Sequence, residues 1–142
     1  MIVKTQSAEE TQKLGEEIAP KLQLGDLVLL KGDLGAGKTT FVQGIAKGLN
    51  AERQPNSPSF AIATEYKIPN GIFRHIDLYR LDNPEIDIDT LGLPEMLTDE
   101  KAITVLEWPE RLKTMWERKG RTIEILLRYK EKTEEREIEI NI

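Results

Sequence analysis

Residues 32–40 have the residue types and spacing of a phosphate-binding (Walker A) loop. Four residues separate Gly32 from Gly37, and Lys38 and Thr39 follow directly. An apolar run precedes the loop and a segment with helical spacing follows it, as this motif requires. The glycines allow backbone N–H groups to point inward and bind an anion at a helix N-terminus. The motif therefore predicts that the chain binds a nucleoside triphosphate.

Within the loop, each side chain has an expected task. Lys38 can reach the β- and γ-phosphates, and the Thr39 hydroxyl can ligate Mg²⁺. The loop residues expected to contact the nucleotide are Asp33, Gly35, Ala36, Gly37, Lys38, Thr39 and Thr40.

Two acids can complete a magnesium site from neighbouring strands. Glu107 closes the mostly apolar run 103–107, as in a Walker B strand, and Asp77 lies in the less apolar run 75–78. We expect Glu107 to contact the metal, directly or through water, and Asp77 to polarise or position the attacking water. The pattern leaves open whether these roles are reversed. Asp77, Glu107 and Lys38 are thus the candidate catalytic residues, and Thr39 and Glu107 the candidate metal ligands.

Ser59 and Trp108 have side chains that can serve the site, whereas His75 receives no role. Ser59 follows the loop helix at the place where many nucleoside triphosphatases carry a γ-phosphate switch, although a loop-to-strand turn explains it equally well. Trp108 can pack over the site, but a tryptophan at a strand end more often belongs to the core. His75 lacks the second histidine or cysteine that a zinc site needs, so no chemistry is assigned to it.

Helices and strands alternate along the first half of the chain. Ser7 and Glu10 form a predicted capping box, and residues 14, 18 and 22 place leucine and isoleucine on one helix face. A strand at 26–31 leads into the phosphate loop, whose helix ends near residue 50. Alternating residues from 60 to 79, interrupted by Asn70 and Gly71, predict an antiparallel hairpin.

The remaining strands are expected at 2–5, 102–106, 123–127 and 138–142. Together these elements predict an α/β fold of the three-layer P-loop NTPase type. Its sheet should be mixed, with a parallel nucleotide-binding core and added antiparallel strands. A length of 142 residues fits one domain, so residues 1–142 are expected to form a single P-loop domain.

Composition limits the partners and the location of the protein. Acidic residues outnumber basic ones by 25 to 20, which argues against direct nucleic-acid binding, so any such contact would pass through another subunit. No signal-peptide pattern or apolar run of about 18 residues is present, so neither secretion nor a membrane partner is expected. The absence of cysteine fits a cytoplasmic protein.

The motifs of GTPases help to decide whether the nucleotide base is adenine or guanine. Residues 89–92 satisfy the short Asp-x-x-Gly pattern of GTPases, but no strong apolar strand precedes them and the Asn-Lys-x-Asp guanine-reading motif is missing. This combination favours ATP, or weak discrimination between bases.

Four blocks give the chain a resemblance to the bacterial TsaE family, also known as YjeE. Order, spacing and length agree over nearly the whole chain. The blocks are Gly-Asp-Leu-Gly-Ala-Gly-Lys-Thr-Thr at 32–40, Ser-Pro-Ser-Phe at 57–60, His-Ile-Asp-Leu-Tyr-Arg-Leu at 75–81 and Glu-Trp-Pro-Glu-Arg at 107–111. Ser59 departs from the threonine that the family often has, but the hydroxyl is kept. Tyr129 and Arg136 lie in a C-terminal part that matches less distinctly, where nucleotide or partner contact is a hypothesis.

The resemblance implies a small ATPase required for threonylcarbamoyl-adenosine at position 37 of tRNAs that read codons starting with A. It implies that the protein binds the TsaD–TsaB pair, that tRNA is met only through that complex, and that ATP hydrolysis depends on the assembly. By the same resemblance, Lys38 holds phosphates, Thr39 and Glu107 hold Mg²⁺, Asp77 is the essential aspartate, and Trp108 stands beside the metal acid.

Two other functions remain open from the residues alone. A small-molecule kinase would pass the γ-phosphate to an acceptor, but the acidic stretch after Arg80 offers no lid arginine before Arg111. Either arginine can stabilise phosphoryl charge, although surface ion pairing is the commoner use. A non-catalytic nucleotide sensor would use the switch loop to report ATP against ADP.

Overall fold

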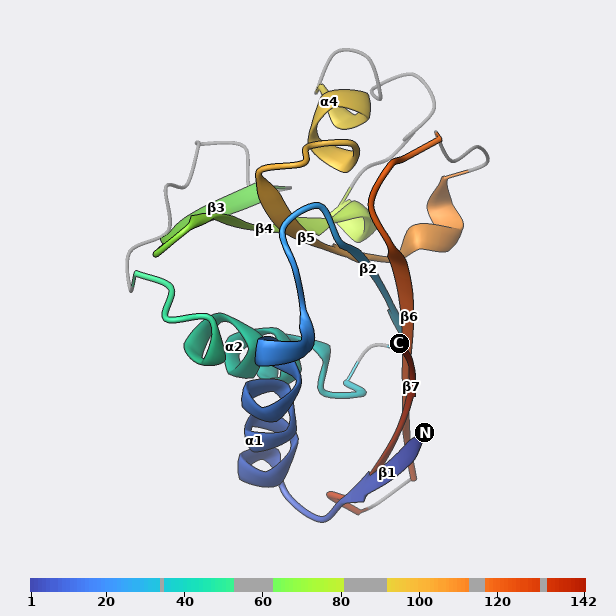
Figure 1. The fold of residues 1–142 in the computed structure, drawn as a ribbon. Coiled ribbons are helices and arrows are strands. Elements are labelled where there is room, and N and C mark those ends of the chain that lie inside the picture. The colour runs from blue at the N-terminus through green and yellow to red at the C-terminus, as the bar shows by residue number, and fades with distance from the viewer. Residues whose placement is uncertain (34, 53–62, 81–91, 113–116, 131–132) are drawn as a thin grey trace.

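In the part of the chain that the structure describes, a seven-stranded mixed sheet organises the fold (Figure 1). The computed structural model describes residues 1–33, 35–52, 63–80, 92–112, 117–130 and 133–142. The strand order is β1-β7-β6-β2-β5-β4-β3. Their bounds are β1 Ile2–Thr5, β2 Leu27–Gly32, β3 Ala63–Ile68, β4 Gly71–Asp77, β5 Ala102–Glu107, β6 Thr122–Tyr129 and β7 Arg136–Asn141.

The direction of the strands confirms the predicted mixed sheet. Strands β6, β2, β5 and β4 run parallel to one another and form the centre. Strand β3 pairs antiparallel with β4 at one edge, and β7 and β1 continue antiparallel from β6 at the other. Strands β2 and β5 are buried on both faces, which explains why they read as unbroken apolar runs.

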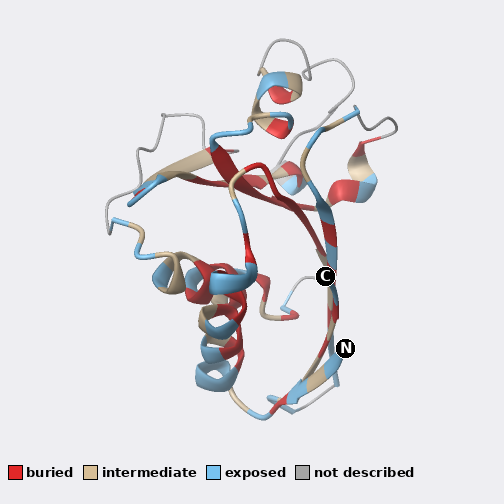
Figure 2. Cartoon of the chain, viewed as in Figure 1, coloured by how far each residue is buried: buried red, intermediate tan, exposed pale blue. Residues whose placement is uncertain are grey.

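Helical elements cover both faces of the sheet. On one face α1 (Ala8–Ile18) and α2 (Lys38–Gly48) pack over a core that includes Phe41, Phe73 and Val105. On the other, α4 (Leu93–Leu97) and the short 3-10 helices η2 (Leu78–Arg80) and η3 (Pro109–Arg111) lie beside a second core. The buried residues gather in the sheet and on the sides of the helices that face it (Figure 2). Among the described residues no helix is long and apolar enough to cross a membrane.

Helix α1 begins as the capping pattern predicts, with one difference. Ser7 is the N-cap, and its Oγ accepts a hydrogen bond of 3.1 Å from the Glu10 N–H. The Glu10 carboxylate accepts from the Gln6 N–H, one residue before the position that a reciprocal capping box would use. The helix continues into the 3-10 helix η1 (Ala19–Lys21).

Two predicted strands extend past the ends of the observed ones. The alternation predicts a return strand of the hairpin that reaches residue 79, but β4 ends at Asp77 because the Asp77 carboxylate accepts the Tyr79 N–H at 3.0 Å and turns the chain. The last strand ends at Asn141, leaving Ile142 exposed. Residues 60–62 of the predicted hairpin lie outside the described residues.

Helices α1 and α2 cross at glycines, which lets their backbones touch. A Cβ atom added to Gly44 would lie 2.0 Å from the Gln12 carbonyl oxygen, and one added to Gly15 would lie 2.5 Å from that of Phe41. The close crossing matters for function because α2 begins at Lys38, in the phosphate loop.

Replacing Gly44 with alanine is expected to lower the free energy of unfolding by about 3 kcal/mol, since the added methyl group meets backbone rather than a flexible side chain. Chemical denaturation would measure this. Gln43→Ala, at an exposed position of the same helix, is the matched control and should change stability by less than about 0.5 kcal/mol. Equal stability of the two variants would show that the helices separate at little cost.

Candidate functional site

The site lies where the carboxyl ends of three parallel strands meet. Strands β2, β4 and β5 are parallel, so their carboxyl ends lie together, where ligands bind in open α/β sheets. The phosphate loop follows β2, Asp77 ends β4 and Glu107 ends β5. The register places Asp77 directly opposite Glu107.

These ends surround a cavity of about 370 Å³. The residues that line it are Gly35, Gly37, Lys38, Thr39, Thr40, Asp77, Tyr79, Glu107, Trp108 and Arg136. Most of the residues predicted from sequence are therefore brought together. Ala36 is instead fully buried behind the loop and Asp33 is exposed, and neither lines the cavity. Ser59 lies outside the described residues.

The loop owes its shape to glycines in the left-handed region. Gly35 has φ of 83° and Gly37 has φ of 95°, values that side-chain-bearing residues rarely adopt. The Ala36 N–H donates to the Asp33 carbonyl at 3.1 Å, and Gly37 is the N-cap of α2. The N–H groups at the first turn of α2, together with the helix dipole, favour an anion at this position.

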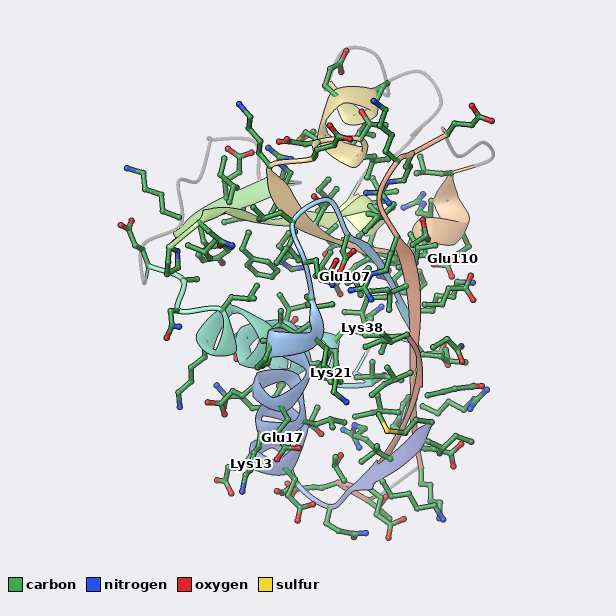
Figure 3. The ribbon with its side chains drawn as sticks, viewed as in Figure 1. Lys13, Glu17, Lys21, Lys38, Glu107 and Glu110 are labelled. Carbon is green, nitrogen blue, oxygen red and sulfur yellow. The ribbon has the colours of Figure 1, made fainter. Side chains whose placement is uncertain are left out.

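Lys38 is buried at the floor of the cavity, close to Glu107 (Figure 3). Its Nζ donates to the Gly32 carbonyl at 2.5 Å and lies 3.8 Å from the centre of the Trp108 ring. Burial lowers the pKa of Lys38 below its ordinary value, while nearby carboxylates oppose this shift, Glu107 most strongly and then Asp77. A buried cation held by a carbonyl and an aromatic ring is suited to a phosphate ligand.

Trp108 belongs to both the core and the site, so its two predicted roles coexist. It packs beside the second core while lining the cavity. Its φ of 59° is in the left-handed region, which costs about 1–2 kcal/mol for a residue with a side chain. The Tyr79 ring stands 5.0 Å from the Trp108 ring, and the pair forms one wall of the cavity.

Arg111 holds the elements behind this wall instead of facing the cavity. Its Nη1 donates to the carbonyls of Leu78 and Tyr79, at 3.2 and 2.6 Å, and so ties η3 to η2. Among the described residues, Arg111 makes these backbone contacts in place of the predicted surface ion pair. The Arg80 side chain lies outside the described part of the chain.

His75, which has no predicted role, contacts the candidate metal ligand. Its Nε2 forms a hydrogen bond with Oε2 of Glu107, and Glu107 is only 4% exposed. The two-residue period of β4 is the signal that points to this contact, because it places His75 on the same face as Asp77.

Arg136 reaches the phosphate loop from the far end of the chain. Its Nη2 donates to the Gly35 carbonyl at 3.2 Å, and its guanidinium lies 5.6 Å from the centre of the Tyr129 ring. The hypothesis of a nucleotide contact in this region therefore has a structural basis at Arg136, which lines the cavity.

The donors that line the cavity suit magnesium. Glu107 and Thr39 present a carboxylate and a hydroxyl, the hard oxygen donors that Mg²⁺ prefers. Within the described ranges no three histidine, cysteine or acidic residues cluster to hold a metal by themselves. Mg²⁺ commonly takes one or two protein carboxylates together with substrate phosphates.

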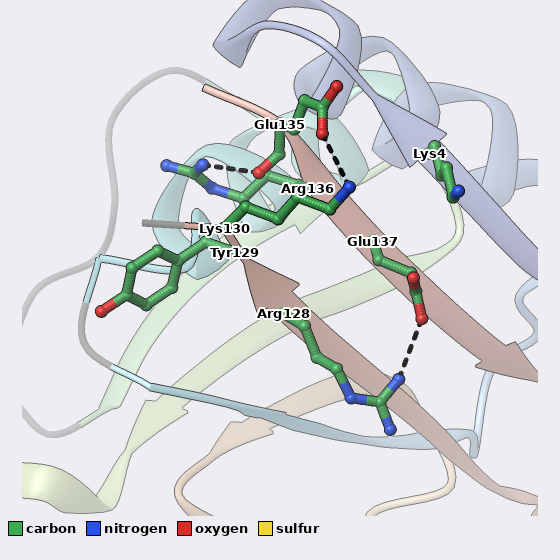
Figure 4. Close-up of a pocket in the computed structure, with 7 residues that line it drawn as sticks. All are labelled: Lys4, Arg128, Tyr129, Lys130, Glu135, Arg136 and Glu137. Carbon is green, nitrogen blue, oxygen red and sulfur yellow. Dashed lines mark hydrogen bonds and ion pairs between the residues drawn. The ribbon is translucent and has the colours of Figure 1, made fainter. Parts of the chain in front are cut away.

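A second cavity, of about 190 Å³, opens beside β1, β6 and β7 (Figure 4). Two of its cations are already paired, Arg128 with Glu137 and Lys130 with Glu135, both at 3.2 Å. These pairs use both of its carboxylates, while its other two cations, Lys4 and Arg136, leave it with a positive balance of charge. Arg136 is directed at backbone carbonyls, and we assign no ligand to this cavity.

Comparison with known proteins finds one family. The family model described as threonylcarbamoyl adenosine biosynthesis protein TsaE matches residues 5–138. A relative from Synechocystis is 42% identical over 106 residues, which cover 72% of this chain and 66% of the relative. One from Aquifex aeolicus is 41% identical, covering 75% and 74%. Both carry the name tRNA threonylcarbamoyladenosine biosynthesis protein TsaE.

A solved structure supports the fold independently. The crystal structure of YdiB from Bacillus subtilis superposes with a TM-score of 0.75 at 31% identity, covering 99% of this chain and 83% of that one. This chain spans slightly less than two thirds of the Synechocystis relative's length. The family match nonetheless extends over nearly all of the present sequence, and the chain belongs to the TsaE family of threonylcarbamoyl adenosine biosynthesis proteins.

Proposed function

We propose that this chain binds and hydrolyses ATP with Mg²⁺ as a subunit of the machinery that forms threonylcarbamoyl-adenosine in tRNA. The proposal extends to position 37 of tRNAs reading codons that start with A, and to a complex with TsaD and TsaB. One observation carries the enzymatic part: a single cavity joins the phosphate loop to two carboxylates at the ends of adjacent strands. The biosynthetic part rests on the names of the matched relatives.

The cavity residues divide the work of hydrolysis between them. The loop N–H groups and Lys38 bind the phosphates, and Lys38 balances charge that develops on the leaving β-phosphate. Thr39 and Glu107 would hold Mg²⁺, which when bound neutralises the β- and γ-oxygens. Asp77, which lies opposite Glu107, would orient a water molecule for attack on the γ-phosphate.

Two features favour a partner-dependent enzyme. Tyr79 is 47% exposed at the wall of the cavity, so a bound protein can reach the site. The net charge of −5 disfavours direct binding of tRNA, which a partner would have to supply. ATP turnover that serves an assembly, and not a free acceptor, is consistent with both features.

Phosphate release tests this function. The purified chain should release little phosphate from ATP alone and substantially more with TsaD, TsaB and substrate tRNA, and Mg²⁺ should be required. Omitting TsaD and TsaB one at a time is the control. Stoichiometric phosphorylation of a small acceptor would favour a kinase. ATP binding without release under any of these conditions would favour a nucleotide sensor.

A further inference from the structure

The contact between His75 and Glu107 follows from the register of two parallel strands. His75 pairs with Val105 and Asp77 with Glu107, and side chains two residues apart share a face. Val105 belongs to the core beneath α1 and α2, so His75 and Glu107 also face the phosphate-loop helix. The imidazole Nε2 meets Oε2 of Glu107 from the neighbouring strand.

Glu107 depends on this contact because its carboxylate is almost completely buried. Its side chain is 5% exposed, and a buried carboxylate is costly unless it is hydrogen-bonded or paired. Among the described residues, His75 is the one hydrogen-bond partner of that carboxylate. Lys38 contributes through its charge, since its Nζ donates to the Gly32 carbonyl instead.

His75 itself stays outside the phosphate cavity. It lines a separate space between α2, β3 and β4, and Thr39 borders both that space and the phosphate cavity. The imidazole therefore meets the Glu107 carboxylate from outside the phosphate cavity, and we expect it to act on the nucleotide through that carboxylate. Holding Oε2 restricts the carboxylate to one orientation and leaves Oε1 available to the cavity.

We propose that His75 is a positioning residue that orients Glu107 for Mg²⁺. The inference rests on the proposed function, because it assumes that Glu107 serves a nucleotide-bound metal. Histidines and carboxylates that hydrogen-bond a ligand from behind commonly change metal affinity by roughly 10- to 100-fold when they are removed. The effect of His75 should accordingly be on Mg²⁺ affinity and not on metal-free nucleotide binding.

The experiment compares three substitutions of His75. His75→Leu removes the imidazole N–H donor. The asparagine side chain of His75→Asn carries an N–H but is too short to bring it to the Nε2 position, whereas the longer glutamine side chain of His75→Gln places an N–H close to that position. Thr64→Val is the matched control, because Thr64 pairs with His75 across β3 and β4 and has no part in the site. Calorimetry measures ATP affinity in EDTA and over a Mg²⁺ titration.

The quantity compared is the Mg²⁺ concentration at which half of the Mg²⁺-dependent increase in ATP affinity is reached. We expect His75→Leu and His75→Asn to raise this concentration roughly 10- to 100-fold. His75→Gln and Thr64→Val should stay close to the wild-type value, and ATP affinity in EDTA should be the same for all. Should His75→Leu not fold, the His75→Asn and His75→Gln pair decides the matter.

Two results would overturn the proposal. Unchanged Mg²⁺ dependence in His75→Asn would show that the imidazole does not orient the metal ligand. Equal losses in His75→Asn and His75→Gln would reduce His75 to a packing residue. Either result leaves ATP hydrolysis by the wild-type protein intact, whereas a wild-type chain that binds no ATP would refute the proposed function itself.

Discussion

Glu107→Ala is expected to lower Mg²⁺-dependent ATP hydrolysis by roughly 10²- to 10³-fold, which corresponds to about 3–4 kcal/mol of lost transition-state stabilisation. The physical reason is the position of Glu107, a residue that is 4% exposed, lines the phosphate cavity and lies close to Lys38. ATP affinity in EDTA should be unchanged or slightly higher, because the substitution removes a negative charge beside the phosphates. Steady-state phosphate release with partner proteins and calorimetry in EDTA would measure the two effects.

Asp77→Ala is the comparison that assigns the two acids. Asp77 lies directly opposite Glu107, but it is only partly buried and one oxygen accepts the Tyr79 N–H. If Asp77 orients water, its removal should lower the hydrolysis rate while Mg²⁺ still strengthens ATP binding. Loss of the Mg²⁺ effect in Asp77→Ala, with the effect retained in Glu107→Ala, would mean that the two roles are exchanged.

Lys38→Ala should weaken ATP binding by roughly 30- to 150-fold, equivalent to about 2–3 kcal/mol for a charge-assisted hydrogen bond. Lys38 is 6% exposed and already desolvated, so its ammonium gains more from a phosphate than a solvated lysine would. The loss should be larger for ATP than for ADP, because in the proposed function Lys38 contacts both the β- and the γ-phosphate. Calorimetric titration with each nucleotide would measure it.

Lys31→Ala is the matched control for this substitution. Lys31 lies on β2 just before the phosphate loop, but its Nζ is 3.6 Å from the Glu124 carboxylate and it does not line the cavity. Its replacement should leave nucleotide affinity unchanged. Unaltered ATP affinity in Lys38→Ala would contradict the assignment of Lys38 to the phosphates.

The sequence predicted those parts of the site whose conformation depends on residues adjacent in the chain. The left-handed glycines and the start of α2 at Lys38 follow from the phosphate-loop pattern, and the N-cap of α1 follows from Ser7. Strands β2 and β5 are predicted as apolar runs because both of their faces are buried. Strand ends follow less closely from the pattern, as the early end of β4 at Asp77 shows.

Contacts between distant segments could not be predicted in this way. His75 and Glu107 are 32 residues apart, and Arg136 lies 101 residues from Gly35. Each contact exists only because β4 pairs with β5, and because β7 returns beside β6 to the phosphate loop. Strand order and register therefore decide these pairings, and neither was specified by the sequence motifs.

Residue types and short-range spacing were enough to predict phosphate binding at residues 32–40 and to select Asp77 and Glu107 as the candidate acids. The folded sheet was needed to show that the acids stand opposite each other, that Glu107 is buried against His75, and that Lys38 lies against Trp108. The reason is that burial, charge pairing and cavity shape are properties of packed elements, which arise when the parallel strand ends are brought to one edge of the sheet.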